Sequence, residues 1–222
     1  MRDSVDTQPR PTCARCLRPA VVCWCDHVVT VPTRTHVVIV QHPAERTKAI
    51  GTGRMAAMCL PGAQVVTSKG WEASPALARL LADGGRPAWL LFPGPDAIDV
   101  DSAPPPGPIT LVVVDGTWGQ ATGIVRRDPL LSGLPRLAFR PATPSEYRIR
   151  RQPRRECLST IEALAHVLGV LEGDPDGMGR LLVPFRAMIE RQIALRDGRY
   201  EPRFTARKMA RRAEAHAGRR GS

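Results

Sequence analysis

Two groups of residues in this 222-residue chain combine types and spacings that suit chemistry. Four cysteines lie within residues 13–25, in the stretch CARCLRPAVVCWC. The tetrapeptide DGTW, residues 115–118, follows directly on the apolar run LVVV in a chain that is only 5% aromatic. Clustered thiolates bind soft metal ions, and a carboxylate at the end of a buried strand is placed to accept a proton. The sequence therefore predicts a metal site and a second site built around an acid and a tryptophan.

The cysteines form a C-x2-C pair and a C-x-C pair six residues apart. Two such pairs can wrap one tetrahedral Zn²⁺, and four thiolates leave no open position, so the ion would be structural. Metal binding would also fold a segment too short to hold itself together. His27 is an alternative ligand, and four incidental reduced cysteines are the alternative to a metal site. Cys59 and Cys157 lie in apolar or helical contexts and are predicted to be packing residues. The predicted zinc ligands are Cys13, Cys16, Cys23 and Cys25.

The elements that position DGTW are apolar runs, each followed by helix signals. Strands are expected within 36–45, 63–68, 87–94 and 109–118, and helices within 46–60, 74–85, 119–128, 159–171 and 179–198, with a loop at 98–108. Apolar runs without alternation, interleaved with helices, indicate an α/β fold with a mostly parallel sheet covered on both faces. Ligands bind beyond the carboxyl ends of such strands. We therefore expect DGTW, QHPAE (41–45) and FPGPDA (92–97) to lie around one site.

The charge of the chain points to a polyanionic partner. The formal net charge is +11, and lysine occurs only at positions 48, 69 and 208, so arginine supplies nearly all of the positive charge. Arginine favours forked contacts to phosphate and stacking on bases, which indicates nucleic acid. Arginine enrichment from a GC-rich genome is the alternative. The polar N-terminus lacks a signal-peptide core, and no apolar run approaches about 20 residues, so we expect a cytoplasmic protein without membrane contact.

Six stretches, in order, resemble motifs of the DTW-domain family over about residues 13–195. DGTW resembles the Asp-x-Thr-Trp signature of that family, and the cysteine pairs resemble its opening motif. The other four are QHPAE, FPGPDA, SEYRIRRQP (145–153) and LSTIEALA (158–165). One departure is Gly51, which stands where relatives tend to have Asn. If that Asn holds substrate, one contact is missing or replaced in this chain.

The resemblance implies a tRNA-uridine aminocarboxypropyltransferase. Such an enzyme transfers the 3-amino-3-carboxypropyl group of S-adenosylmethionine to N3 of a tRNA uridine, giving acp3U, with position 47 expected for bacterial members. The implied fold is related to the knotted SPOUT methyltransferases. The implied organisation is a zinc-binding segment (1–30), a catalytic α/β domain (31–200) and a basic tail (201–222), acting on tRNA and not DNA, with a monomer favoured.

The resemblance also implies roles for residues. Asp115 is the candidate general base for N3–H, provided that burial raises its pKa; capping the next helix is the alternative role. Thr117 would bond the donor or only cap that helix, and Trp118 would stack on a base or fill the core. Candidate donor-binding residues are Pro93, Gly94, Asp115, Gly116, Ser145, Tyr147, Arg150, Leu158, Ser159, Thr160 and Glu162. Candidate acceptor-binding residues are His42, Glu45, Arg54, Trp118, Arg148 and Arg151.

Two other functions fit the same residues. One is a SPOUT-like RNA methyltransferase that uses the same donor and transfers its methyl group. The other is a zinc-containing RNA-binding module without catalysis. The mass of the product distinguishes the methyltransferase. Mutation of Asp115 distinguishes the binding module, because only an enzyme loses catalytic activity when that carboxylate is removed.

Overall fold

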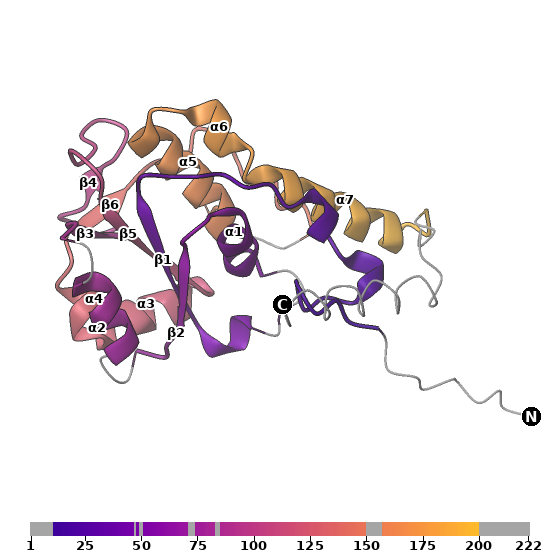
Figure 1. Ribbon diagram of the computed structural model, residues 1–222, viewed down its shortest axis with the longest axis horizontal. Coiled ribbons are helices and arrows are strands. Elements are labelled where there is room, and N and C mark those ends of the chain that lie inside the picture. Colours follow the sequence, from indigo (N-terminus) through magenta and orange to yellow (C-terminus); the bar gives the residue numbers. More distant parts are fainter. Residues whose placement is uncertain are drawn as a thin grey trace, which may run out of the picture.

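The protein is built around one six-stranded sheet in which every strand pair is parallel (Figure 1). The computed structural model describes residues 11–46, 48, 51–70, 74–82, 85–149 and 157–199. The strand order is β2-β1-β5-β3-β6-β4. The strands are β1 (His36–Gln41), β2 (Gln64–Thr67), β3 (Ala88–Leu91), β4 (Ile98–Asp99), β5 (Thr110–Asp115) and β6 (Arg136–Ala138). The prediction of an α/β fold with a mostly parallel sheet is confirmed.

Helices cover both faces of this sheet, and alternate strand residues belong to two separate hydrophobic clusters. Val38 and Val112 pack with α2, α3 and α4, whereas Ile39 and Leu111 pack with α1, α5 and α7. The helices are α1 (Gly53–Cys59), α2 (Pro75–Ala82), α3 (Trp118–Arg127), α4 (Pro129–Ser132), α5 (Thr160–Glu172), α6 (Pro175–Gly179) and α7 (Leu182–Arg196), with 3-10 turns η1 (Ala20–Val22), η2 (Cys25–His27) and η3 (Pro43–Glu45). Central strands buried on both faces explain the uninterrupted apolar runs of the sequence.

The N-terminal segment with the four cysteines packs onto the sheet body rather than standing apart. Cys16, Trp24 and Val31 are buried in the same cluster as β1 and β5. Arg191 of α7 lies 3.0 Å from Nε2 of His27 on η2. The segment therefore shares a core with the helices on one face, as its position beside α7 in Figure 1 indicates.

Short elements depart from the sequence prediction. β4 lies in the stretch 98–108, where a loop is predicted, and pairs with β6 through Ile98↔Leu137 and Asp99↔Ala138. α4, β6 and α6 have no counterpart among the expected elements. None of the helices in the described part of the chain combines the length and hydropathy that a membrane span requires.

Candidate functional site

A cavity of about 1020 Å³ opens at the carboxyl ends of β3, β5 and β6. The residue runs that follow these three strands line it, together with the start of α5. The lining consists of Leu91, Phe92, Pro93, Val113, Val114, Gly116, Trp118, Ala121, residues 137–141, residues 157–160 and Ala163. This is the edge at which parallel α/β sheets bind ligands, because the connections after the strands diverge there.

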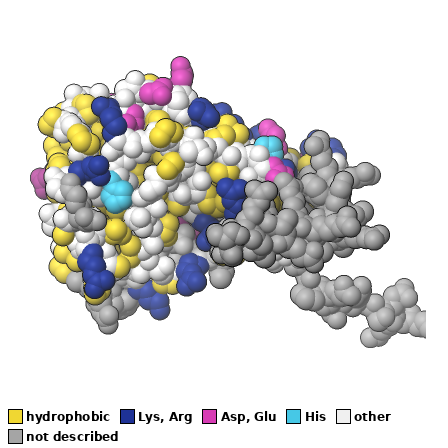
Figure 2. Space-filling model, in the orientation of Figure 1, with side chains coloured by type: hydrophobic (Ala, Val, Ile, Leu, Met, Phe, Trp, Pro, Cys, Tyr) yellow, Lys and Arg dark blue, Asp and Glu magenta, His cyan; other side chains and the backbone are white. Residues whose placement is uncertain are grey.

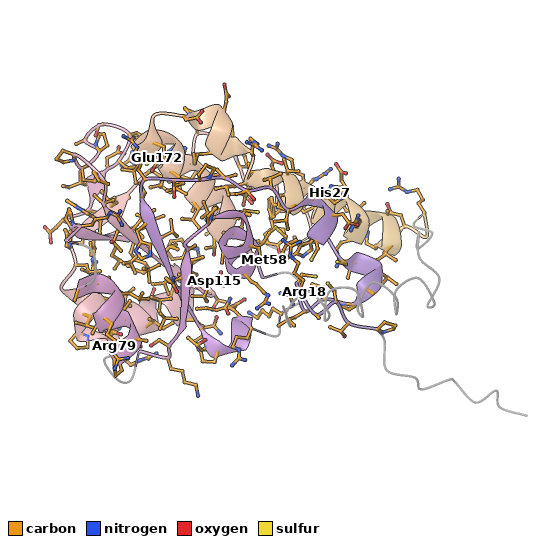
Figure 3. The ribbon with its side chains drawn as sticks, in the orientation of Figure 1. Arg18, His27, Met58, Arg79, Asp115 and Glu172 are labelled. Atoms are coloured by element: carbon orange, nitrogen blue, oxygen red, sulfur yellow. The ribbon has the colours of Figure 1, made fainter. Side chains whose placement is uncertain are left out.

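Asp115 ends β5 beside this cavity but is itself buried, with 4% of its surface exposed (Figure 3). The Gln41 amide donates to its Oδ2 at 2.9 Å, and the Thr160 hydroxyl donates to its Oδ1 at 2.7 Å. Gln41 lies opposite Asp115 in the β1–β5 register. A Cβ at Gly53, the first residue of α1, would lie 2.5 Å from the Asp115 carboxylate carbon. The carboxylate thus joins β1, β5, α1 and α5.

The pKa of Asp115 is raised by its burial, which disfavours the charged form. Hydrogen bonds from Gln41 and Thr160 oppose this shift, and the nearby charge of Glu45 adds to it. A raised pKa is what a carboxyl group needs in order to accept a proton near neutral pH. Each oxygen of this carboxylate, however, already accepts one of these two hydrogen bonds.

The three residues after Asp115 make a tight turn into α3. Thr117 is the N-cap of α3. Its Oγ1 accepts from the backbone N–H of Gln120 at 3.3 Å, and Oε1 of Gln120 accepts from the backbone N–H of Thr117 at 2.8 Å. This reciprocal capping satisfies two amides at the helix start. Gly116 lines the cavity, and Trp118 lies at its rim with 45% of its surface exposed. The sequence DGTW therefore buries its acid, caps a helix and leaves its tryptophan outward.

The loop after β1 lies against the same turn. The His42 amide donates to the Asp115 carbonyl at 2.9 Å, and the His42 ring accepts from the Ala44 amide at 3.2 Å. Glu45 is buried and pairs with Lys48 at 2.6 Å. The predicted convergence of this loop with DGTW is present, although neither His42 nor Glu45 lines the cavity.

Ser145, Ser159 and Glu162 form a connected group at the start of α5. The Glu162 carboxylate is 7% exposed and accepts from both serine hydroxyls, at 2.7 and 2.6 Å. It also accepts from the backbone amides of Ser159 at 2.8 Å and Glu146 at 2.7 Å. Glu162 thus fixes the 145–147 segment onto α5, and it leaves Leu158, Ser159 and Thr160 at the cavity wall.

Several other candidate residues lie away from the cavity. Tyr147 is buried and packs edge-on against Phe185, with ring centroids 5.0 Å apart. Arg148 is exposed, and Gly94 makes room for the Arg136 side chain, whose Nη1 would lie 2.6 Å from a Cβ there. Arg54 donates to the Arg15 carbonyl at 2.9 Å, beside the cysteine segment. Arg150 and Arg151 lie outside the described residues, as does the basic tail, residues 201–222.

A buried arginine, Arg18, lies next to Gly51, and the sequence alone predicts no role for it. Arg18 is 2% exposed, and its Nη2 would lie 3.5 Å from a Cβ at Gly51. Burial lowers the pKa of Arg18. A side chain at position 51 would therefore face this guanidinium, which lies between the cysteine segment and the loop after β1.

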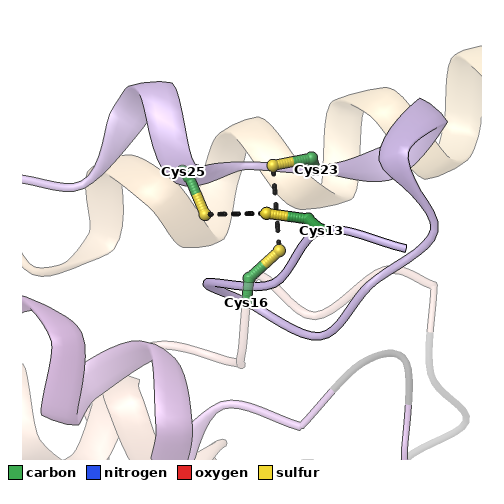
Figure 4. Close-up of side chains that lie close together, drawn as sticks. All are labelled: Cys13, Cys16, Cys23 and Cys25. Atoms are coloured by element: carbon green, nitrogen blue, oxygen red, sulfur yellow. Dashed lines mark hydrogen bonds between the residues drawn. The ribbon is translucent and has the colours of Figure 1, made fainter. Parts of the chain in front are cut away.

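The four predicted zinc ligands converge (Figure 4). Their sulfur atoms all lie within 4.8 Å of one another, and the Cys13–Cys25 and Cys16–Cys23 sulfurs are 3.8 and 3.7 Å apart. Zn–S bonds of about 2.3 Å in a tetrahedron place sulfurs about 3.8 Å apart, so the group fits one Zn²⁺. His27 is not in this group. Cys59 is buried in the core, as predicted, whereas Cys157 is half-buried and lines the cavity.

Four residues that contact or flank the site are not predicted from the sequence. They are Gln41, Gly53, Phe92 and Arg136. Gln41 and Phe92 stand in the quoted stretches QHPAE and FPGPDA, so their position after a strand was an available signal. Gly53 and Arg136 carried no local signal, because their roles depend on which strand and helix lie next to them.

The chain is similar to proteins of one family along most of its length. The family model described as DTW domain matches residues 10–193. Two relatives named tRNA-uridine aminocarboxypropyltransferase 2, from Macaca fascicularis and Drosophila melanogaster, are each 34% identical to this chain over 83% of its length. The match covers 64% of the macaque protein and 76% of the fly protein. An Arabidopsis thaliana relative, tRNA-uridine aminocarboxypropyltransferase A, is 26% identical over 82% of this chain and 81% of its own length.

The chain thus spans 64% of the length of the macaque relative, somewhat less than two thirds. No solved structure matches it. Three of the six motifs, DGTW, FPGPDA and LSTIEALA, contribute residues to the cavity lining, and the family model covers these motifs and the cysteine segment. The chain therefore belongs to the DTW domain family.

Proposed function

We propose that this protein is a tRNA-uridine aminocarboxypropyltransferase that forms acp3U, at position 47, from S-adenosylmethionine. The observation that carries the proposal is the cavity at the strand ends, lined by the DGTW turn and the start of α5, in a chain whose relatives bear that enzyme name. In the reaction, uridine N3 bonds to the donor carbon as the carbon–sulfur bond breaks. Methylthioadenosine leaves with the bonding electrons, and the N3 proton passes to a base.

The enzyme's task in this reaction is largely positioning. The sulfonium activates three carbons, and the carbon that faces N3 in line is the one transferred. A cavity with fixed walls sets that choice. The cavity lining includes Gly116, Pro93 and residues 157–160. The loops after β3 and β5, and the residues that lead into α5, would therefore hold the donor. Ser145, Tyr147 and Glu162 would act through the packing of α5 rather than by touching the donor.

Two roles for Asp115 agree with its surroundings, and one substitution separates them. As a general base it would take the N3 proton, which its raised pKa supports. As a positioning residue it would hold Thr160 at the cavity wall, which the 2.7 Å hydrogen bond supports. Asp115→Asn preserves the shape and abolishes the base. Activity near the wild-type level in that variant supports positioning, and activity as low as in Asp115→Ala supports the base.

The four cysteines are proposed to hold a structural Zn²⁺, because their sulfur spacing fits a closed tetrahedral site. The ion would fix the segment of residues 1–30 onto the catalytic α/β domain, proposed as 31–200, with 201–222 as a basic tail. Arginines of the segment and tail would contact tRNA phosphates, consistent with the net charge of +11. We further propose that the enzyme works as a monomer in the cytoplasm, where thiols stay reduced.

The sheet is proposed to be SPOUT-related. Two features support this: β5 enters the sheet between β1 and β3, and β6 enters between β3 and β4. Each of these two strands is therefore inserted between two strands that come earlier in the sequence. An experimental structure compared with a knotted SPOUT methyltransferase tests the assignment, and a chain path that forms no knot would contradict it.

Mass spectrometry of nucleosides tests the proposed activity. Unmodified tRNA is incubated with S-adenosylmethionine and the protein, with Asp115→Ala in parallel. The expected result is a uridine heavier by one aminocarboxypropyl group, methylthioadenosine as co-product, and no product from the variant. A uridine heavier by one methyl group would identify a methyltransferase instead. Absence of any modified nucleoside, with tRNA still bound, would favour the RNA-binding module.

A further inference from the structure

One part of the cavity wall carries two aromatic rings that lie close together, with an arginine against one of them. Trp118 is the first residue of α3 and lines the cavity, yet 45% of its surface is exposed. Trp24, by contrast, is fully buried, and Trp89 is half-buried. Ligand pockets are lined largely by hydrophobic and aromatic side chains, so a tryptophan that lines a cavity and is also open to solvent is placed to contact a ligand.

Phe92 and Arg136 extend this surface. The Phe92 ring lies 6.1 Å from the Trp118 ring at an interplanar angle of 52°, and the Arg136 guanidinium carbon lies 6.0 Å from the Phe92 centroid. Gly94 permits the arrangement, because a Cβ there would lie 2.6 Å from Nη1 of Arg136. The residues after β3 and β5 and the first residue of β6 therefore bring two rings and one guanidinium together.

The charge at this end fits an anionic ligand. None of the ion pairs within the described residues involves Arg136, or Arg140, which lines the cavity. S-adenosylmethionine carries a sulfonium, an ammonium and one carboxylate, so its net charge is positive. A nucleotide within RNA carries a negative phosphate beside its base. The unpaired guanidiniums thus complement the acceptor better than the donor.

The cavity is large for a single small ligand. Its volume of about 1020 Å³ lies at the upper end of the range of pockets that hold a single small ligand. A donor that lay against residues 157–160 and Gly116 would occupy only part of that space. The Trp118 end remains for a base that leaves its stack, and single-stranded RNA loops offer such bases.

We infer that Phe92 and Trp118 form a stacking shelf for one unstacked nucleotide of the RNA acceptor, with Arg136 directed to its phosphate. This inference rests on the proposed function and names the place where that function holds its acceptor. The shelf would bind a nucleotide by stacking and by charge, which every base and phosphate offers. It would therefore select an extruded nucleotide rather than a base sequence. The donor is held by other residues of the same cavity.

Paired binding measurements test the shelf. Unmodified tRNA transcript and S-adenosylmethionine are titrated separately, by filter binding and calorimetry, into wild type, Trp118→Ala, Trp118→Phe and Arg136→Gln. Arg180→Gln is the control, because Arg180 is exposed and lies outside the cavity lining. Trp118→Ala is expected to weaken tRNA binding about 5- to 150-fold, to leave donor affinity unchanged, and to be largely rescued by Trp118→Phe. Arg136→Gln should lower the salt dependence of tRNA binding by about one counterion.

Two outcomes would overturn the inference. Weaker donor binding with unchanged tRNA binding in Trp118→Ala would assign the shelf to the adenine of the donor. Unchanged affinity for both substrates would leave Trp118 without a binding role. Failure of the proposed function is recognised separately: wild-type protein would then form no acp3U, while Trp118 would still determine how tightly tRNA binds.

Discussion

The hydroxyl of Thr160 donates a hydrogen bond of 2.7 Å to Oδ1 of Asp115, and this contact joins the first turn of α5 to the carboxyl end of β5. The two residues are 45 positions apart in sequence. Thr160 lines the cavity, whereas Asp115 is buried behind it. The shape of the cavity wall therefore depends on a carboxylate that does not itself line the cavity.

Thr160→Val tests this contact. Valine keeps the shape but removes the donor, so Oδ1 of Asp115 loses its bond inside the protein. We expect the free energy of unfolding to fall by about 1–3 kcal/mol in urea titrations. Thr160→Ser retains a hydroxyl and should recover most of that loss. Equal stability of the valine and serine variants would show that the hydrogen bond contributes little.

Gly53 gives a second test of the Asp115 environment. A methyl group on Gly53 would lie 2.5 Å from the Asp115 carboxylate, whereas one on Gly119, in the first turn of α3, meets nothing within 4 Å. Gly53→Ala should therefore lower the free energy of unfolding by about 1–3 kcal/mol. Gly119→Ala should be neutral or stabilising by up to about 1 kcal/mol. Similar effects of the two substitutions in urea titrations would contradict the close approach.

The raised pKa of Asp115 predicts a specific dependence of stability on pH. Its ordinary value is 3.8, and burial shifts the folded value upward. Between the two values the folded protein binds more protons than the unfolded chain, so the free energy of unfolding falls as pH rises through that window. Asp115→Asn cannot titrate and should lack this component. Urea titrations of both proteins from about pH 4 upward, compared as a difference, should show the wild-type advantage shrinking; a difference that grows with pH would contradict the upward shift.

Glu162 is predicted to be needed for the start of α5. Its carboxylate accepts from two hydroxyls and two backbone amides, so Glu162→Gln would turn one acceptor into a donor facing other donors. We expect a loss of about 1–3 kcal/mol in the free energy of unfolding. The control is Glu190→Gln on α7, where the carboxylate is exposed. A cost no larger than that of the control would contradict the role assigned to these four bonds.

The sequence predicts best where one local signal decides the structure. The apolar run before Asp115 marks β5, and Thr117 caps α3 through bonds within its own turn. β6 and β4 have three and two residues, so their strand character comes from pairing with neighbours rather than from a pattern. Such elements are set by tertiary contacts, which a single sequence does not display.

The residues of the site also differ in whether a local sequence signal predicts them. DGTW and the cysteine cluster are recognisable because their spacing is local. Gln41 and Thr160 lie 74 and 45 positions from Asp115, and only the strand register and the placement of α5 bring them to its carboxylate. Tyr147 shows the converse: its place beside arginines in the sequence predicts a ligand contact, whereas in the fold its ring packs against Phe185 in the core.

The cysteine cluster supports a prediction about metal and stability together. Cys16 and its neighbours Trp24 and Val31 belong to the main core, so losing the ion should loosen that part of the protein rather than a free segment. Purified protein is expected to contain one zinc per chain, and chelation should lower its melting temperature by about 2–4 °C for each kcal/mol lost. Cys16→Ser should lack zinc and melt lower without chelator, whereas Cys157→Ser, outside the cluster, should keep its zinc. Zinc-free wild type whose melting temperature does not respond to chelator would show that the four thiols close this core without an ion.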